Sequence, residues 1–79
     1  MKYAYMLQSK VNPSRYYVGS TRDLKKRFNA HNAGHSEHTR KYLPWELRGY
    51  VAFSEPAKAD KFEAYLKTGS GRAFAKRHF

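Results

Sequence analysis

Three segments of the chain carry the aromatic, β-branched and alternating hydrophobic residues typical of β-strands. They cover residues 2–8, 16–19 and 45–53. The first two are separated by the turn-prone Asn12-Pro13-Ser14-Arg15, which predicts an antiparallel hairpin. In the third segment we expect the alternating large side chains to face the core, namely Trp45, Leu47, Val51 and Phe53.

The hydrophobic spacing becomes helical after the hairpin. The first predicted helix runs to about Asn32, with Asp23 or Thr21 as its cap and Gly34 as its stop. Its apolar side holds Leu24 and Phe28, and two polar side chains lie beside them, Arg27 and His31. Residues 35–44 are polar and basic and predict a loop.

Two further helices are predicted near the C-terminus. Ser54-Glu55-Pro56 is a helix-start signal, and Ala59, Phe62 and Leu66 follow at helical spacing until Gly69 stops the helix. Ser70 can then cap a short basic helix. The order β-β-α-β-α-α predicts an α+β fold, a small three-stranded, mainly antiparallel sheet flanked by helices. With 79 residues we expect one domain, residues 1–79, with a single modest core.

The charge of the chain favours a polyanionic partner. Sixteen Lys and Arg against six Asp and Glu give a formal charge of +10, so nucleic acid is the expected ligand through its phosphates. A membrane surface is disfavoured because the basic residues are spread along the chain. The absence of cysteine excludes disulfides, thiolate metal sites and cysteine nucleophiles. No segment resembles a signal peptide or a transmembrane helix, and we expect a cytoplasmic protein.

Five side chains could together hydrolyse a phosphodiester. The reaction needs a base for water, positive charge at the phosphate and help for the departing alkoxide. A phenol can act as the base only beside a cation, because it titrates near ~10 when unperturbed. Tyrosines on the two hairpin strands can meet if the register permits, and Gly19 keeps backbone space open beside them. The candidate set is Tyr5, Tyr17, Arg27, His31 and Glu63.

The order of these residues resembles the GIY-YIG nuclease family, especially small stand-alone members and the nuclease domain of structure-specific junction endonucleases. Tyr3-Ala4-Tyr5 stands at the first motif and Tyr17-Val18-Gly19 at the second. The segment Leu24-Lys25-Lys26-Arg27-Phe28-Asn29-Ala30-His31-Asn32 is similar to the family's helix with an arginine and a histidine. Asn32-Ala33-Gly34 followed by Pro44-Trp45-Glu46-Leu47 resembles the junction-endonuclease branch.

The resemblance implies a role for each candidate. Tyr17 is the base or base relay, Tyr5 and Arg27 act on the scissile phosphate, and His31 assists. Glu63 falls where the family keeps the glutamate that binds one Mg²⁺ or Mn²⁺ ion. The implied activity is metal-dependent cleavage of DNA, in repair or recombination, with branched, flapped or nicked DNA as substrate and a partner protein as a possible source of specificity.

Two departures from the family keep another function open. The first motif lacks its glycine and isoleucine, and no asparagine occurs beyond Asn32, where Ser70 or Arg72 occupies the region in which many active members have one. The alternative is a nucleic-acid-binding module with little or no cleavage. A basic RNA-associated protein is a third hypothesis, supported by charge alone.

Ordinary structural roles also compete with the catalytic ones. Tyr17 and Tyr5 could be core aromatics, His31 could stabilise a helix end, and Glu63 could pair with Lys67 at i+4. A transition-metal cluster of His31, His35 and His38 is disfavoured because no carboxylate accompanies them. Residues 67–72 lack the Walker spacing, so no nucleotide cofactor is expected. DNA phosphates would meet exposed basic side chains, for which we select Arg22, Lys26, His38, Arg40, Lys41 and Arg72.

Overall fold

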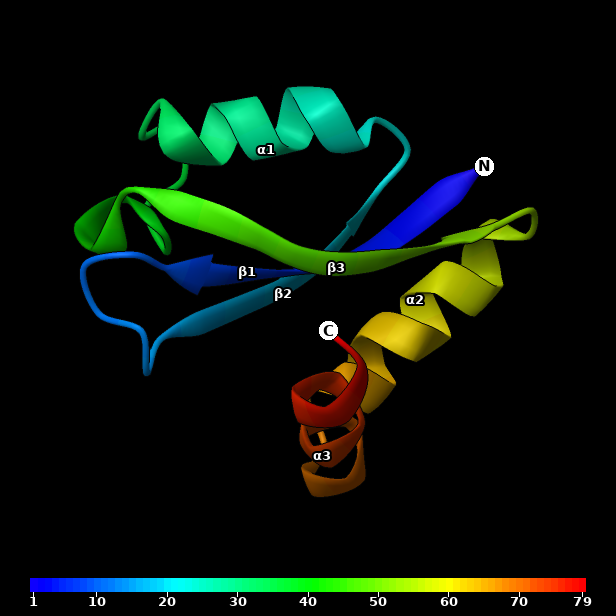
Figure 1. Cartoon of the computed structure of the whole chain (residues 1–79). Helices are drawn as coiled ribbons and strands as arrows, with labels where there is room; N and C mark the ends of the chain where they lie inside the picture. The colour runs from blue at the N-terminus through cyan, green and yellow to red at the C-terminus, as the bar shows by residue number, and fades with distance from the viewer.

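The computed structural model describes all residues from Met1 to Phe79 and confirms the predicted fold class. Three strands form one antiparallel sheet in the order β2-β1-β3. Helix α1 covers one face of the sheet, and α2 and α3 cover the other (Figure 1). The elements in chain order are β1 (Lys2–Ser9), β2 (Tyr16–Thr21), α1 (Leu24–Asn32), a 3₁₀-helix (Arg40–Tyr42), β3 (Trp45–Phe53), α2 (Pro56–Leu66) and α3 (Gly69–His78).

The sheet separates two hydrophobic clusters, so the expectation of a single core is wrong. On the α1 side, Tyr5 and Leu7 pack with Trp45, and Leu24 and Phe28 of the helix cover them. On the other side, Met6 packs with Leu66 and Ala75 and with partly buried aromatic rings from α2 and α3. Successive residues of the central strand β1 point to opposite faces, and each face is covered by helices.

A register shift in β3 divides the predicted core residues between these two clusters. Leu7 pairs with Leu47, but the preceding residue of β1, Met6, pairs with Gly49. Arg48 is therefore an extra residue of β3 at this point. Such a bulge reverses the side-chain alternation beyond it. Trp45 and Leu47 therefore pack on the α1 side, whereas the Phe53 ring lies 5.6 Å from that of Phe62 in α2.

The helix starts follow local capping chemistry. Asp23 caps α1, as expected, with its carboxylate accepting a hydrogen bond of 3.0 Å from the backbone N–H of Lys26. The expected cap of the last helix, Ser70, is wrong. The Thr68 hydroxyl instead accepts a hydrogen bond from the backbone N–H of Gly71, and α3 begins at Gly69. Gly71 packs against the backbone of Tyr65, where a Cβ atom would collide.

The basic segment between α1 and β3 is anchored on the sheet. Asn32 bonds both backbone groups of Trp45, accepting from its N–H at 2.7 Å and donating to its carbonyl at 3.0 Å. Thr39 is completely buried, and its carbonyl accepts from the indole N–H of Trp45 at 2.7 Å. Gly34, the expected helix stop, adopts φ 80°. None of the helices has the length and the apolar character needed to cross a membrane.

Candidate functional site

The two hairpin strands bring both predicted tyrosines together above Gly19. Tyr5 pairs with Gly19 across the sheet, and Tyr17 is two residues further along the same face of β2. The ring centroids of Tyr5 and Tyr17 are 6.3 Å apart. A Cβ atom at Gly19 would lie 2.6 Å from the Tyr5 hydroxyl and 3.1 Å from the Tyr17 ring. The absence of a side chain at Gly19 therefore allows the Tyr5 hydroxyl to cross β2 toward the edge of the sheet.

His31 holds Tyr5 from the helix side. Its Nε2 lies 3.0 Å from the Tyr5 hydroxyl, and its Nδ1 lies 2.9 Å from Oγ1 of Thr39. The imidazole is fully buried, and burial together with the positive charge of Arg27 lowers its pKa to about 4. His31 is therefore neutral at neutral pH, and both ring nitrogens are engaged by neighbouring side chains.

Arg27 brings a guanidinium to the same phenols. Its pKa is raised, mainly by the side chain of Tyr5 and also by that of Tyr17. Burial raises the pKa of the Tyr5 hydroxyl, with Arg27 opposing that rise. Tyr5 is accordingly a protonated phenol, and the half-buried Tyr17 ring lies 4.8 Å from the imidazole of His31. Tyr5, Tyr17, Arg27 and His31 thus form one cluster on the α1 side of β2.

Glu63 approaches β2 from α2, on the other face of the sheet. One carboxylate oxygen accepts a hydrogen bond of 2.8 Å from the Ser20 hydroxyl, and the other accepts from Lys67 at 3.0 Å. Ser20 also lies 3.0 Å from the carboxylate of Asp60, which binds Lys2 at 2.7 Å. The ion pair with Lys67 that competes with a catalytic role for Glu63 is therefore present.

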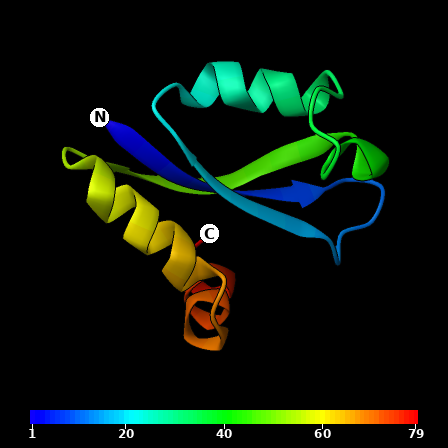
Figure 2. The same cartoon turned by 180° about the vertical axis from the view of Figure 1, so that it is seen from behind.

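The two halves of the candidate site meet around the edge strand. Figure 2 shows β2 passing between α1 on one side and α2 on the other. Gly19, beneath the Tyr5 hydroxyl, is the chain neighbour of Ser20, which bonds Glu63. The negative charge of Glu63 contributes to raising the pKa of Tyr5, so the two side chains are electrostatically coupled across this edge.

The donor set around Glu63 suits a hard divalent cation. Its side chain is 24% exposed, and the neighbouring donors are the oxygen atoms of Ser20 and Asp60 rather than imidazole nitrogen or sulfur. Mg²⁺ is commonly held by one or two carboxylates and completes its coordination with water and phosphate oxygens. No group of three or more His, Asp or Glu residues could hold a metal on its own, and this excludes the histidine cluster.

The six basic residues selected for phosphate contact are all exposed but lie in three separate places. Arg22 and Lys26 are at the start of α1, and Arg72 is on α3, which covers the opposite face of the sheet (Figure 1). The remaining three, His38, Arg40 and Lys41, belong to the segment after α1. Arg40 there pairs loosely with Glu37 at 3.8 Å.

Three residues of this neighbourhood were not among the predicted site residues. Thr39 binds His31, and Ser20 joins Asp60 to Glu63. Ser20 had a detectable signal, because it directly follows the Tyr17-Val18-Gly19 motif. Thr39 had none, because it lies in an irregular segment whose path depends on tertiary contacts. Asp60 stands one turn before Glu63 on the predicted helix, a spacing that could have indicated it.

The site joins one phenol from the central strand and one from the edge strand with an arginine from α1 and a carboxylate from α2, the groups that phosphodiester hydrolysis needs. A family model described as the GIY-YIG catalytic domain matches residues 1–77. The chain belongs to the GIY-YIG nuclease family.

Relatives of the same size are similar over most of their length. A UPF0213 protein of Streptococcus agalactiae serotype V is 34% identical over 79 residues, covering 95% of this chain and 90% of the relative. A UPF0213 protein of Streptococcus pyogenes serotype M5 is 38% identical over 73 residues, covering 91% of this chain and 79% of the relative. These are small proteins built around the GIY-YIG domain alone.

Proposed function

We propose that the protein is a metal-dependent DNA endonuclease that selects its substrate by DNA structure. The observation that carries the proposal is the grouping of Tyr5 and Tyr17 at Gly19 with the Arg27 guanidinium beside both phenols. Glu63 is bonded to the next residue of β2. This grouping combines the base, the phosphate clamp and the metal ligand that phosphodiester hydrolysis needs.

Tyr17 is the residue to which we assign proton removal from the attacking water. It is half-buried and neighbours the Arg27 guanidinium. Tyr5 is less suited to this role because burial keeps its proton on the hydroxyl. Its oxygen instead orients the water and the scissile phosphate.

Arg27 neutralises charge on the phosphate oxygens as the bond between phosphorus and the leaving oxygen breaks. A guanidinium presents its donors in a rigid fork that fits two phosphate oxygens at once. His31 acts through Tyr5, since it is buried and neutral and does not reach the substrate. We therefore assign it a positioning role, with Thr39 fixing the orientation of its ring.

Glu63 would hold one divalent ion, Mg²⁺ or Mn²⁺. When bound, the ion supplies positive charge that stabilises the transition state at phosphorus. Loading requires Lys67 to release one carboxylate oxygen, an exchange that costs little because exposed ion pairs of this kind contribute only a few tenths of a kcal/mol.

A binding module without cleavage is the second candidate, favoured by the occupation of both Glu63 oxygens and by the lack of a late asparagine. The two functions are separated by incubating pure protein with linear, nicked, flap and four-way DNA, in Mg²⁺, in Mn²⁺ and in chelator. Cleavage of branched or flap DNA that needs the metal supports the nuclease. Retained binding without cleavage in every condition supports the module.

A further inference from the structure

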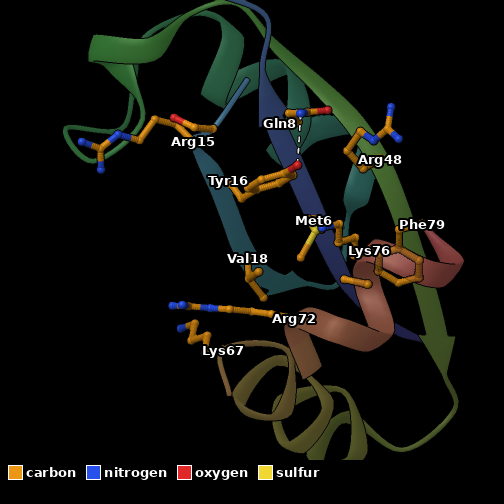
Figure 3. A pocket seen from close by; sticks show the side chains of 12 residues that line it. Met6, Gln8, Arg15, Tyr16, Val18, Arg48, Lys67, Arg72, Lys76 and Phe79 are labelled. Carbon is orange, nitrogen blue, oxygen red and sulfur yellow. Dashed lines mark hydrogen bonds between the residues drawn. The ribbon is translucent and has the colours of Figure 1, made fainter. Parts of the chain in front are cut away.

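A concavity lies on the face of the sheet opposite α1. It has a volume of about 690 Å³ and is bounded on one side by α3. Its floor is formed by side chains of β1 and β2 that point away from the cluster around Tyr5. These floor residues are Met6, Gln8, Tyr16 and Val18 (Figure 3). We call this concavity the α3 groove.

The α3 groove is strongly basic. No acidic side chain lines it, and its five charged side chains are all cationic: Arg15, Arg48, Lys67, Arg72 and Lys76. Arg48 and Lys67 have acidic neighbours outside the groove. The other three cations form no ion pair, but the Arg15 guanidinium lies 5.1 Å from the centroid of the Tyr42 ring. Arg72 and Lys76 are therefore the cations available to a ligand. A concave surface lined by one sign of charge concentrates oppositely charged ligands.

An exposed aromatic ring stands among these cations. Tyr16 is 54% exposed, and its hydroxyl accepts a hydrogen bond of 3.1 Å from the Gln8 amide. Figure 3 shows the Tyr16 ring between Arg15 toward one end of the groove and Arg72 with Lys67 toward the other. An exposed aromatic ring beside cations is the arrangement by which proteins stack the bases of a single strand while binding its phosphates.

The groove leads toward the catalytic carboxylate. Tyr16, Val18 and Ser20 alternate along one face of β2, and Ser20 bonds Glu63. Lys67 lines the groove and also donates to Glu63 at 3.0 Å. The four residue steps from Tyr16 to Ser20 span roughly 13 Å, which is about four nucleotides at the spacing of a duplex strand and fewer for a stretched one.

From this arrangement we propose that the α3 groove binds a single-stranded segment of DNA and leads it to Glu63. A concavity of this volume admits a short stretch of one phosphodiester chain with its bases, and a duplex with its two paired strands is too bulky to enter it. The inference rests on the proposed nuclease function for its biological meaning, since the bound segment would be the flap of a flapped substrate. Binding in the groove itself requires no cleavage.

The test measures the affinity of the full chain for a short oligothymidylate and for a blunt duplex, by fluorescence anisotropy in chelator. The variants are Arg72→Ala with Lys76→Ala, and separately Tyr16→Ala. The matched control is Lys58→Ala with Lys61→Ala, which removes the same charge from exposed positions of α2 outside the groove. Thermal unfolding of each variant verifies that it is folded.

We expect the variant with both Arg72→Ala and Lys76→Ala to bind the single strand about tenfold more weakly or worse. The magnitude of the slope of log affinity against log salt should fall by about 1.4, the value for two lost single-strand phosphate contacts. The control should change neither slope nor single-strand preference. Tyr16→Ala should weaken binding by roughly tenfold, and Tyr16→Phe should restore it, because stacking needs the ring and not the hydroxyl.

An equal loss of single-strand affinity in the groove variants and in the control variant would overturn the proposal. It would also be overturned if polyglutamate of the same total charge displaced the oligothymidylate as well as unlabelled oligothymidylate does. Cleavage assays on flap and nicked DNA with Mg²⁺ separate this inference from the nuclease function. Metal-dependent cleavage that the groove variants leave unchanged would refute the groove alone. Single-strand binding in the groove without any cleavage would refute the nuclease alone.

Discussion

The Tyr5 hydroxyl lies 3.0 Å from Nε2 of His31, so a buried imidazole fixes a phenol at the edge of the sheet. The other imidazole nitrogen is 2.9 Å from Thr39, which anchors the segment after α1. The contact thus joins strand, helix and loop in one network in the interior. Because burial and the charge of Arg27 keep His31 neutral, the stability of this network should depend on pH.

The first prediction is a loss of stability in mild acid. The pKa of His31 is about 4 in the folded protein against 6.5 ordinarily, so only the unfolded chain takes up the proton between these values. The contribution of His31 is fully present above about pH 6.5 and falls as the pH decreases toward 4, by about 3 kcal/mol in all. Urea unfolding at several pH values measures it. The difference between wild type and His31→Gln should shrink across this window, and a constant difference would contradict the assignment.

The second prediction concerns the space above Gly19. In Gly19→Ala the new Cβ would lie 2.6 Å from the Tyr5 hydroxyl, and the buried Tyr5 ring has no free space into which to move. We expect a loss of about 1–3 kcal/mol in unfolding free energy and a large loss of cleavage. Gly69→Ala is the matched control, because a Cβ there meets nothing within 4 Å. Equal effects of the two substitutions on unfolding would show that the close approach at Gly19 is not rigid.

The strands and the first helix follow from local sequence signals. The third strand was predicted over residues 45–53 and is Trp45–Phe53, and the cap at Asp23 is also confirmed. These features depend on side-chain alternation and on short-range capping, which the sequence carries directly. The approach of Tyr5 to Tyr17 likewise follows from the short hairpin, whose length limits the possible registers.

The features that were not predicted depend on contacts between distant segments. The bulge in β3 is favoured because it places Trp45 and Phe53 in different clusters, and alternation alone assigns both to one face. Thr39 acquires its partner only when its segment folds back over α1. The α3 groove forms between elements more than forty residues apart, so charge counting predicted a polyanion but not where it binds.

The third prediction tests the base. Tyr17→Phe removes only the hydroxyl and keeps the ring that packs against Tyr5 and His31. Cleavage should fall by about 10²-fold or more, the usual contribution of a general base, with stability and metal-free DNA affinity nearly unchanged. Single-turnover cleavage and anisotropy measure the two effects. Tyr50→Phe removes the hydroxyl of an exposed tyrosine on β3, so it is the control and should cleave normally. Normal cleavage by Tyr17→Phe would remove it from the proton-transfer role.

The last prediction separates an enzyme from a binding module. Glu63→Gln keeps the size of the side chain and its hydrogen bond with Ser20 but removes the negative charge that Mg²⁺ needs. Cleavage should fall by orders of magnitude, whereas DNA affinity in chelator should stay equal or rise slightly, because a negative charge has left a surface that meets phosphates. The loss of the Lys67 pair should cost only a few tenths of a kcal/mol.

The control for Glu63 is Glu55→Gln, which removes a carboxylate that pairs with Lys58 at 3.6 Å. This pair is similar in chemistry but does not touch β2, so both cleavage and affinity should remain at wild-type levels. Metal titrations followed by cleavage rate add a second measure, since Glu63→Gln should need far more Mg²⁺ for any residual activity. If Glu63→Gln and Glu55→Gln cleave alike, Glu63 serves only to bind Lys67 and Ser20, and the metal must be held elsewhere.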